Sequence, residues 1–244
     1  HSRFAGDMLP DGGFEVDLSK AFLNISTAVR NMANATTEYK YTLRHTLKDA
    51  QGHEVSSCEV KGTVLQGKQV HICKTQMTVE DPHLWSCKDP YLYTVVTDIF
   101  VNERHTDRYT TTTGLRHIDF DKDKGFFLNG EHVKLNGVCL HHDLGALGSA
   151  VNRSALKRQL TIMKEMGVNS VRCSHNPPSL ELLDLCDEMG ILVMDEAFDM
   201  WRQRKTERDY ARFFEQWHER DLTDLVVRDR NHPCIIMWSI GNEV

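Results

Sequence analysis

The spacing of apolar residues changes near residue 117, and this change constrains the fold more than any other feature of the chain. Before it, large and polar side chains alternate, as in residues 39–48. A period of two is typical of a strand with one buried face. Similar runs cover residues 22–31, 55–64, 69–79, 91–101 and 107–117. Several short strands without a helical pattern predict an antiparallel β-sandwich of the immunoglobulin type.

After residue 117, apolar strands alternate with amphipathic helices. Strands are expected at residues 135–140, 168–172, 191–195 and 234–240, and helices at 152–166, 177–189 and 210–228. An Asn-Gly pair at residues 129–130 predicts a hairpin turn. This order indicates a parallel sheet covered by helices, either an open doubly wound sheet or part of a barrel.

Composition and charge exclude several classes of protein. The 244 residues carry 35 acidic and 29 basic side chains, a net charge of −6, and no basic block that would bind nucleic acid or an anionic membrane. No apolar run approaches the roughly 20 residues of a membrane span, and residues 1–10 lack the apolar core of a signal peptide. The seven cysteines form no C-x-x-C pair, so we expect free thiols.

Polar residues follow each of the four later strands where it ends. The ends of parallel barrel strands meet at one rim, where active sites are built. Any one of these residues could be an ordinary loop or capping residue, but the pattern repeats at four successive strands. The residues concerned are His141, His142, Asp143, Ser174, His175, Asn176, Asp195, Glu196, Asp199, Trp201, Asn242 and Glu243.

Three kinds of chemistry compete for this set. A metal hydrolase could use His141, His142, His175 and Asp195, although no H-x-H or H-E-x-x-H motif is present. Nucleophilic catalysis would need a nucleophile elbow, which is missing. Amides, imidazoles and an indole instead suit a sugar, whose hydroxyls they bind and whose C–H face they stack on. Glu243 would then be one of two carboxylates that flank a glycosidic bond.

The chain resembles glycoside hydrolase family 2, the β-galactosidase and β-glucuronidase group, over almost its whole length. The resemblance rests on strings in the expected order: Leu84-Trp85-Ser86, Asp89-Pro90-Tyr91, Thr113-Gly114-Leu115-Arg116, Asn136-Gly137-Val138, Arg172-Cys173-Ser174-His175-Asn176-Pro177, Met194-Asp195-Glu196-Ala197, Asn231-His232-Pro233 and Trp238-Ser239-Ile240-Gly241-Asn242-Glu243. It implies an immunoglobulin-like β-sandwich over residues 1–117, with residues before about 20 unassigned. The N-terminal half of a (β/α)8 TIM barrel would follow over residues 118–244, truncated after strand four.

The resemblance also implies roles for particular residues. Glu243 would be the catalytic general acid and base, and Asn242 would bind the sugar 2-hydroxyl. Arg172 would orient the nucleophile, or alternatively form a salt bridge between strand ends. The remaining substrate-binding residues would be His141, His175, Asp199 and Trp201. Asp195 and Glu196 are expected to be structural, with Asp195 hydrogen-bonded within the rim.

Two departures from the family's pattern limit these expectations. Met200 and Arg202 stand where the metal-dependent branch has an acid and a histidine, so we expect no cofactor and no catalytic metal. The family's nucleophile lies on strand seven, beyond residue 244, so we expect the 244 residues alone to be inactive.

The expected parent is a retaining exo-β-glycosidase, a β-galactosidase before a β-glucuronidase, with a non-catalytic carbohydrate-binding module as a further alternative. The expected partner is a β-galactoside or related oligosaccharide. Copies of the chain could associate through the open barrel edge. The compartment stays open between bacterial cytoplasm and periplasm.

Overall fold

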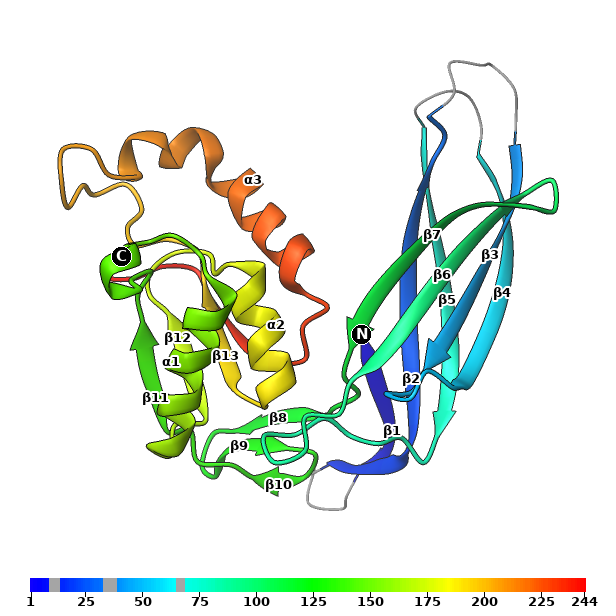
Figure 1. Ribbon diagram of the computed structural model, residues 1–244, viewed down its shortest axis with the longest axis horizontal. Helices are drawn as coiled ribbons and strands as arrows, with labels where there is room; N and C mark the ends of the chain where they lie inside the picture. The colour runs from blue at the N-terminus through cyan, green and yellow to red at the C-terminus, as the bar shows by residue number, and fades with distance from the viewer. Residues whose placement is uncertain (9–13, 33–38, 65–68) are drawn as a thin grey trace. The chain divides into compact units, whose positions relative to one another are not determined.

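The computed structural model describes residues 1–8, 14–32, 39–64 and 69–244, which form two compact units. One unit comprises His1–Leu84 and Tyr91–His117, and the other comprises Trp85–Pro90 and Ile118–Val244. Each unit has its own sheets (Figure 1).

The first unit consists of two antiparallel sheets. One has the order β1 (Ser2–Met8), β2 (Phe14–Arg30), β5 (Val70–Glu80), and the other has the order β4 (Glu54–Val64), β3 (Tyr39–Lys48), β6 (Tyr93–Val101), β7 (Arg104–Thr113). Residues buried in its core come from both sheets and include Leu23, Leu47, Met77, Val79 and Val95. The alternation in the sequence therefore arises because every second side chain faces this core, and the predicted sandwich is confirmed.

The sequence did not reveal the start of this unit. Strand β1 lies among residues left unassigned, and β2 begins at Phe14 rather than at residue 22. Residues 2–8 carry few apolar side chains, so pairing with β2, from Ser2 opposite Leu23 to Met8 opposite Phe14, defines the strand. A strand that is defined mainly by its pairing leaves little periodicity in the sequence itself.

The second unit begins with a small antiparallel sheet of β8 (Ile118–Asp121), β9 (Gly125–Leu128) and β10 (Glu131–His132). Asn129 and Gly130 join β9 to β10, with φ angles of 53° and 79°. Both values lie in the left-handed region that a type I′ hairpin turn requires, so the Asn-Gly prediction is confirmed.

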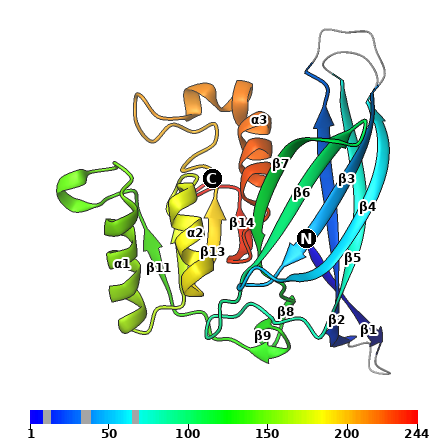
Figure 2. The same cartoon turned by 45° about the vertical axis from the view of Figure 1, so that its right-hand side comes forward.

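Four parallel strands follow, in the order β11 (Gly137–Leu140), β12 (Ser170–Cys173), β13 (Leu192–Glu196) and β14 (Ile235–Ser239). Each strand pairs with its neighbour in the sequence, which is the order of a TIM barrel and not of a doubly wound sheet. The helices between them are α1 (Arg153–Glu165), α2 (Leu180–Met189) and α3 (Ala211–Asp229), with a short 3-10 turn at Gly145–Leu147. Figure 2 shows α1 and α2 beside β11 and β13. The predicted fold class, a β-sandwich followed by the first part of a barrel, is confirmed.

Capping residues that favour helix ends lie at the ends of α1 and α2. The side chain of Asn152 accepts a hydrogen bond from the amide of Ala155 and begins α1, and Ser179 does the same for α2. Gly190 ends α2 with φ 68°, and a Cβ there would lie 2.6 Å from the carbonyl oxygen of Cys87. In α3, Phe214 and Leu225 are buried, whereas Phe213 is 45% exposed and lies outside the buried face.

The segment Trp85–Pro90 packs with the second unit although the residues on both sides of it belong to the first. Trp85 is fully buried, and its indole nitrogen donates to the carbonyl of Asp187 at 2.8 Å. This carbonyl lies in the last turn of α2, where helical carbonyls lack an intrahelical donor. Trp85 therefore caps α2 from outside.

All seven cysteines are free thiols, as expected. Among the described residues, no helix combines the length and apolar character needed to cross a membrane.

Candidate active site

The carboxyl ends of β12, β13 and β14 are tied together by Glu196. Arg172 on β12 donates from Nε to Glu196 Oε2 and from Nη2 to Oε1, both at 2.9 Å. Ser239 at the end of β14 donates to Oε2 at 2.7 Å, and His175 Nδ1 lies 2.8 Å from Oε1. The predicted convergence of strand ends at one rim is therefore present in the structure.

Glu196 has no free hydrogen-bonding position. Its side chain is 1% exposed, and its two oxygens receive the four contacts just described. Burial alone would raise the pKa of Glu196, but the hydrogen bonds from Arg172, Ser239 and His175 outweigh it, so the pKa is lowered. A buried carboxylate whose acceptor positions are all occupied links the strand ends at the rim.

Two histidines bring the end of β11 into the same site. The ring of His141, just after β11, meets the ring of His175 edge to face, with centroids 5.3 Å apart and an interplanar angle of 89°. The peptide bond between Ser174 and His175 is cis.

Asn242 and Asp199 extend this network from Arg172. Nη2 of Arg172 donates to Asn242 Oδ1 at 2.9 Å, and Asn242 Nδ2 donates to Asp199 Oδ1 at 3.1 Å. Burial raises the pKa of Asp199, but hydrogen bonds from Lys205 and Asn242 lower it by more, so the net shift is downward. Asp199 also lines a cavity of about 520 Å³ that includes Tyr210 and Leu225 of the following loop and helix.

Glu243 directly follows Asn242, and its side chain is 75% exposed. Its φ angle of 50° lies in the left-handed region, an uncommon backbone conformation for a residue with a side chain. Within the described part of the chain, Lys205 joins it to the other site residues: Lys205 Nζ lies 2.9 Å from Glu243 Oε2 and 2.7 Å from Asp199 Oδ1. Sequence reasoning missed Lys205, because the residue lies in a loop without a motif.

Trp201 closes the same end of the sheet. Its indole nitrogen donates to the carbonyl of Ile240 at 2.8 Å, and its ring stacks on Phe214 at a centroid distance of 6.0 Å. Gly241 permits this approach, because a Cβ there would lie 2.7 Å from Trp201 Nε1.

Asp195 is not part of the rim, and the expected hydrogen bond there is wrong. Its side chain is fully buried, and neither of its oxygens receives a hydrogen bond within the described chain. Successive strand residues face opposite sides, so Asp195 points away from the site to which Glu196 points. Burial and the neighbouring carboxylate of Asp229 raise the pKa of Asp195 to about 7.

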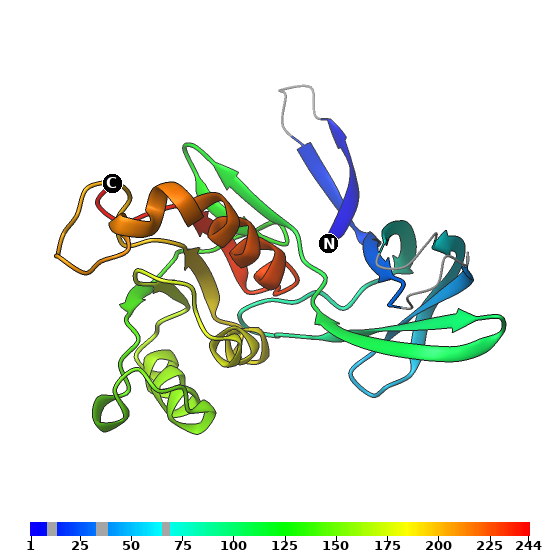
Figure 3. The same ribbon diagram turned by 90° about the horizontal axis from the view of Figure 1, so that it is seen from above.

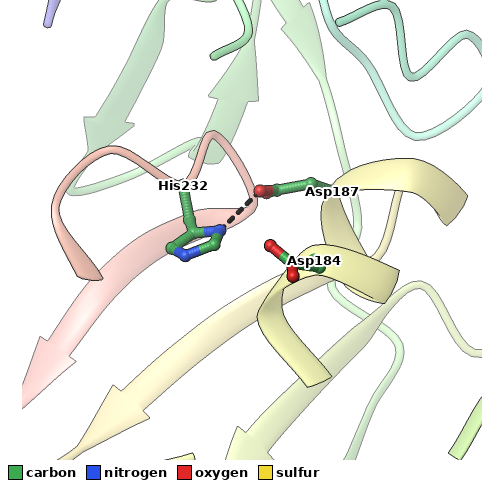
Figure 4. A group of neighbouring side chains, drawn as sticks. All are labelled: Asp184, Asp187 and His232. Atoms are coloured by element: carbon green, nitrogen blue, oxygen red, sulfur yellow. Dashed lines mark hydrogen bonds and ion pairs between the residues drawn. The ribbon is translucent and has the colours of Figure 1, made fainter. Parts of the chain in front are cut away.

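The geometry does not favour the metal set of His141, His142, His175 and Asp195. Over residues 1–8, 14–32, 39–64 and 69–244, only Asp184, Asp187 and His232 bring three ligand atoms of these types within 4.8 Å (Figure 4). Asp187 is already occupied, with Oδ2 2.6 Å from His232 Nδ1 and Oδ1 accepting from the amide of Cys234 at 2.9 Å. Through these hydrogen bonds the cluster links α2 to the segment that leads into β14.

Comparison with protein families assigns both parts of the chain. Residues 11–116 match the model for glycosyl hydrolases family 2, and residues 121–244 match the model for the TIM barrel domain of the same family. The chain therefore belongs to glycosyl hydrolases family 2.

Individual relatives agree with this class. The chain is 55% identical over 94% of its length to the beta-galactosidase BoGH2A of Bacteroides ovatus, and 34% identical over 69% to a beta-glucuronidase of Bacteroides fragilis. It spans 27% and 25% of the length of these two proteins.

Solved structures show the same architecture. A family 2 member from Bacteroides cellulosilyticus superposes with a TM-score of 0.87 at 42% identity, over 92% of this chain and 29% of that one. A beta-glucuronidase of Bacteroides uniformis superposes with a TM-score of 0.81 at 29% identity, over 100% of this chain and 28% of that one.

Proposed function

We propose that the full-length protein carrying this chain is a retaining exo-β-glycosidase that removes terminal β-linked galactose. The observation that carries the proposal is the continuous contact network from Arg172 through Asn242, Asp199 and Lys205 to Glu243. It gathers amide, carboxylate and cationic groups at one strand-end rim, and the 55% identical relative named beta-galactosidase supports the choice of sugar.

In this proposal Glu243 protonates the leaving oxygen and then removes a proton from the attacking water. Its exposure supports the assignment, because a proton donor must reach the departing group of a bound substrate. Asn242, held at Oδ1 by Arg172, binds the sugar 2-hydroxyl, a contact that strengthens toward the oxocarbenium-like transition state. His141, His175, Asp199 and Trp201 surround the terminal sugar.

We further propose that the nucleophile lies outside residues 1–244. A retaining mechanism needs a second carboxylate about 5 Å from the acid. Glu196 is unsuited to attack, because four hydrogen-bonding contacts occupy its oxygens. Arg172 uses Nε and Nη2 on Glu196. Among the described residues, Nη1 has only a 3.9 Å contact with Cys139 Sγ, so it could orient a nucleophile. The 244 residues alone are then inactive.

A β-glucuronidase is the second candidate. A specific observation favours it: Lys205 places an ammonium beside Asp199, where it could meet a carboxylate at C6 of the sugar. Against it, Lys205 already has two carboxylate partners within the chain.

A panel of 4-nitrophenyl glycosides tests the proposal with the full-length protein. We expect hydrolysis of the β-galactoside well above that of the β-glucuronide, none of the α-galactoside, and a product that keeps the β configuration when followed by NMR. Preference for the β-glucuronide would show that the protein is a β-glucuronidase and not a β-galactosidase. Binding of galactose without hydrolysis of any glycoside would instead favour a carbohydrate-binding module.

A further inference from the structure

The loop between β13 and α3 carries one cation into the candidate site. Lys205 lies midway along this loop. Figure 3 shows the C-terminal end of the chain beside the loop. Lys205 Nζ contacts Asp199 Oδ1 at 2.7 Å and Glu243 Oε2 at 2.9 Å. Its side chain is 28% exposed, so solvent reaches it only in part.

Hydrogen bonds to the side chain of Asp209 fix the backbone around Lys205. Asp209 Oδ2 accepts hydrogen bonds from the amides of Lys205 at 2.6 Å and Thr206 at 2.8 Å, and its Oδ1 accepts from the amide of Ala211 at 3.1 Å. Asp209 thus joins the middle of the loop to the first residue of α3. The position of the ammonium follows from this anchored backbone and from Asp199, which Asn242 holds in turn.

We propose that Lys205 is a positioning residue for Glu243. Glu243 is otherwise exposed, and a freely rotating carboxyl protonates a leaving oxygen inefficiently, because general acid catalysis depends on a fixed short distance. The ammonium is the group that links Glu243 to Asp199 and hence to the proposed sugar-binding residues. Lys205 donates hydrogen bonds to Asp199 and Glu243, and these raise the pKa of Lys205. The ammonium therefore keeps its protons at neutral pH and can donate to Glu243 in both its carboxylic acid and its carboxylate form.

This inference rests on the proposed function. The dependence of kcat/KM on the leaving group distinguishes failure of the inference from failure of the proposed function. Departure of 2,4-dinitrophenolate needs no proton, whereas departure of an alkoxide does. In the full-length protein, we expect Lys205→Met to lower kcat/KM for methyl β-galactoside by about 10- to 100-fold and for 2,4-dinitrophenyl β-galactoside by less than about 3-fold. Lys205→Arg keeps a cation and should restore much of the loss.

Arg208→Met is the matched control, because it removes an exposed cation from the same loop, and Arg208 has no hydrogen bond or ion pair to Glu243, Asp199 or Asp209 among the described residues. It should leave both substrates unchanged. Thermal unfolding of all variants reports whether the fold survives. Equal losses on both substrates, or no loss on either, would overturn the role of Lys205 while leaving the glycosidase proposal intact. A wild-type protein that hydrolyses neither galactoside would overturn both.

Discussion

Arg172 and Glu196 form a two-pronged ion pair across the ends of β12 and β13, with both N···O distances at 2.9 Å. Because Glu196 is 1% exposed, the pair is a structural element of the rim as well as a neighbour of the site. A single hydrogen bond to Glu196 would allow the guanidinium to rotate, whereas two parallel hydrogen bonds fix its plane.

Removing one partner of this pair should destabilise the protein. Arg172→Met leaves a buried carboxylate with only His175 and Ser239 as donors, and we expect the free energy of unfolding to fall by about 3 kcal/mol. Urea denaturation measures the change. The control is Arg153→Met, whose pair with Glu188 is exposed on both sides and should cost less than about 1 kcal/mol. Similar losses in the two variants would contradict the anchoring role of Glu196.

The raised pKa of Asp195 predicts a pH dependence of stability. Its folded value of about 7 exceeds the reference value of 3.8, so the folded state binds the proton more tightly than the unfolded state. Asp195 therefore makes the free energy of unfolding decrease as pH rises from about 4 to about 7, with no further change above that range.

Asp195→Asn cannot ionise and should remove this slope, making the variant more stable than the wild type at pH 8 by more than about 1 kcal/mol. Denaturation curves at pH 5 and pH 8 test this, with Asp224→Asn on the exposed face of α3 as the control. An unchanged slope in the Asp195 variant would show that another group titrates.

Trp85 should matter through the hydrogen bond of its indole nitrogen. Trp85→Phe keeps an aromatic ring but leaves the carbonyl of Asp187 without its indole donor, so we expect a loss of about 2 kcal/mol in the free energy of unfolding. Trp217→Phe, on a partly exposed face of α3, should change stability by less than about 0.5 kcal/mol. If Trp85→Phe is equally mild, Trp85 does not cap α2.

Gly241 should control the position of the indole. A methyl group at this residue would lie 2.7 Å from Trp201 Nε1, so Gly241→Ala should displace Trp201. Under the proposed function, this substitution in the full-length protein should raise KM for a β-galactoside about 10-fold. In a Trp201→Phe background the smaller ring relieves the clash, so the second substitution should cost much less. Equal effects of Gly241→Ala in both backgrounds would remove Trp201 from the explanation.

The sequence predicted those elements whose signals are local. Asn152, Ser179 and Gly190 mark helix ends at the residues where the structure has them, since capping depends on the few residues beside each end. Strand β1 has no such signal, because its pairing with β2 defines it. The rim could also be predicted, since residues just after parallel strands must meet at one edge.

Two features of the site could not be predicted from the sequence. Asp195 and Glu196 are adjacent carboxylates, so strict alternation along the strand already places them on opposite sides. Which of the two faces the site depends on strand register, which the sequence does not give. Lys205 lies in a loop whose conformation depends on hydrogen bonds to Asp209, and no periodicity reports such contacts. Both became apparent only from side-chain partners.

The most direct test of the central proposal is Glu243→Ala in the full-length protein, assayed with 2,4-dinitrophenyl β-galactoside with and without sodium azide. Without its general base the glycosyl-enzyme should accumulate, and azide, which needs no base, should restore turnover and yield β-galactosyl azide. A variant that turns over as fast as the wild type, or one that azide does not rescue, would contradict the role of Glu243 as acid and base.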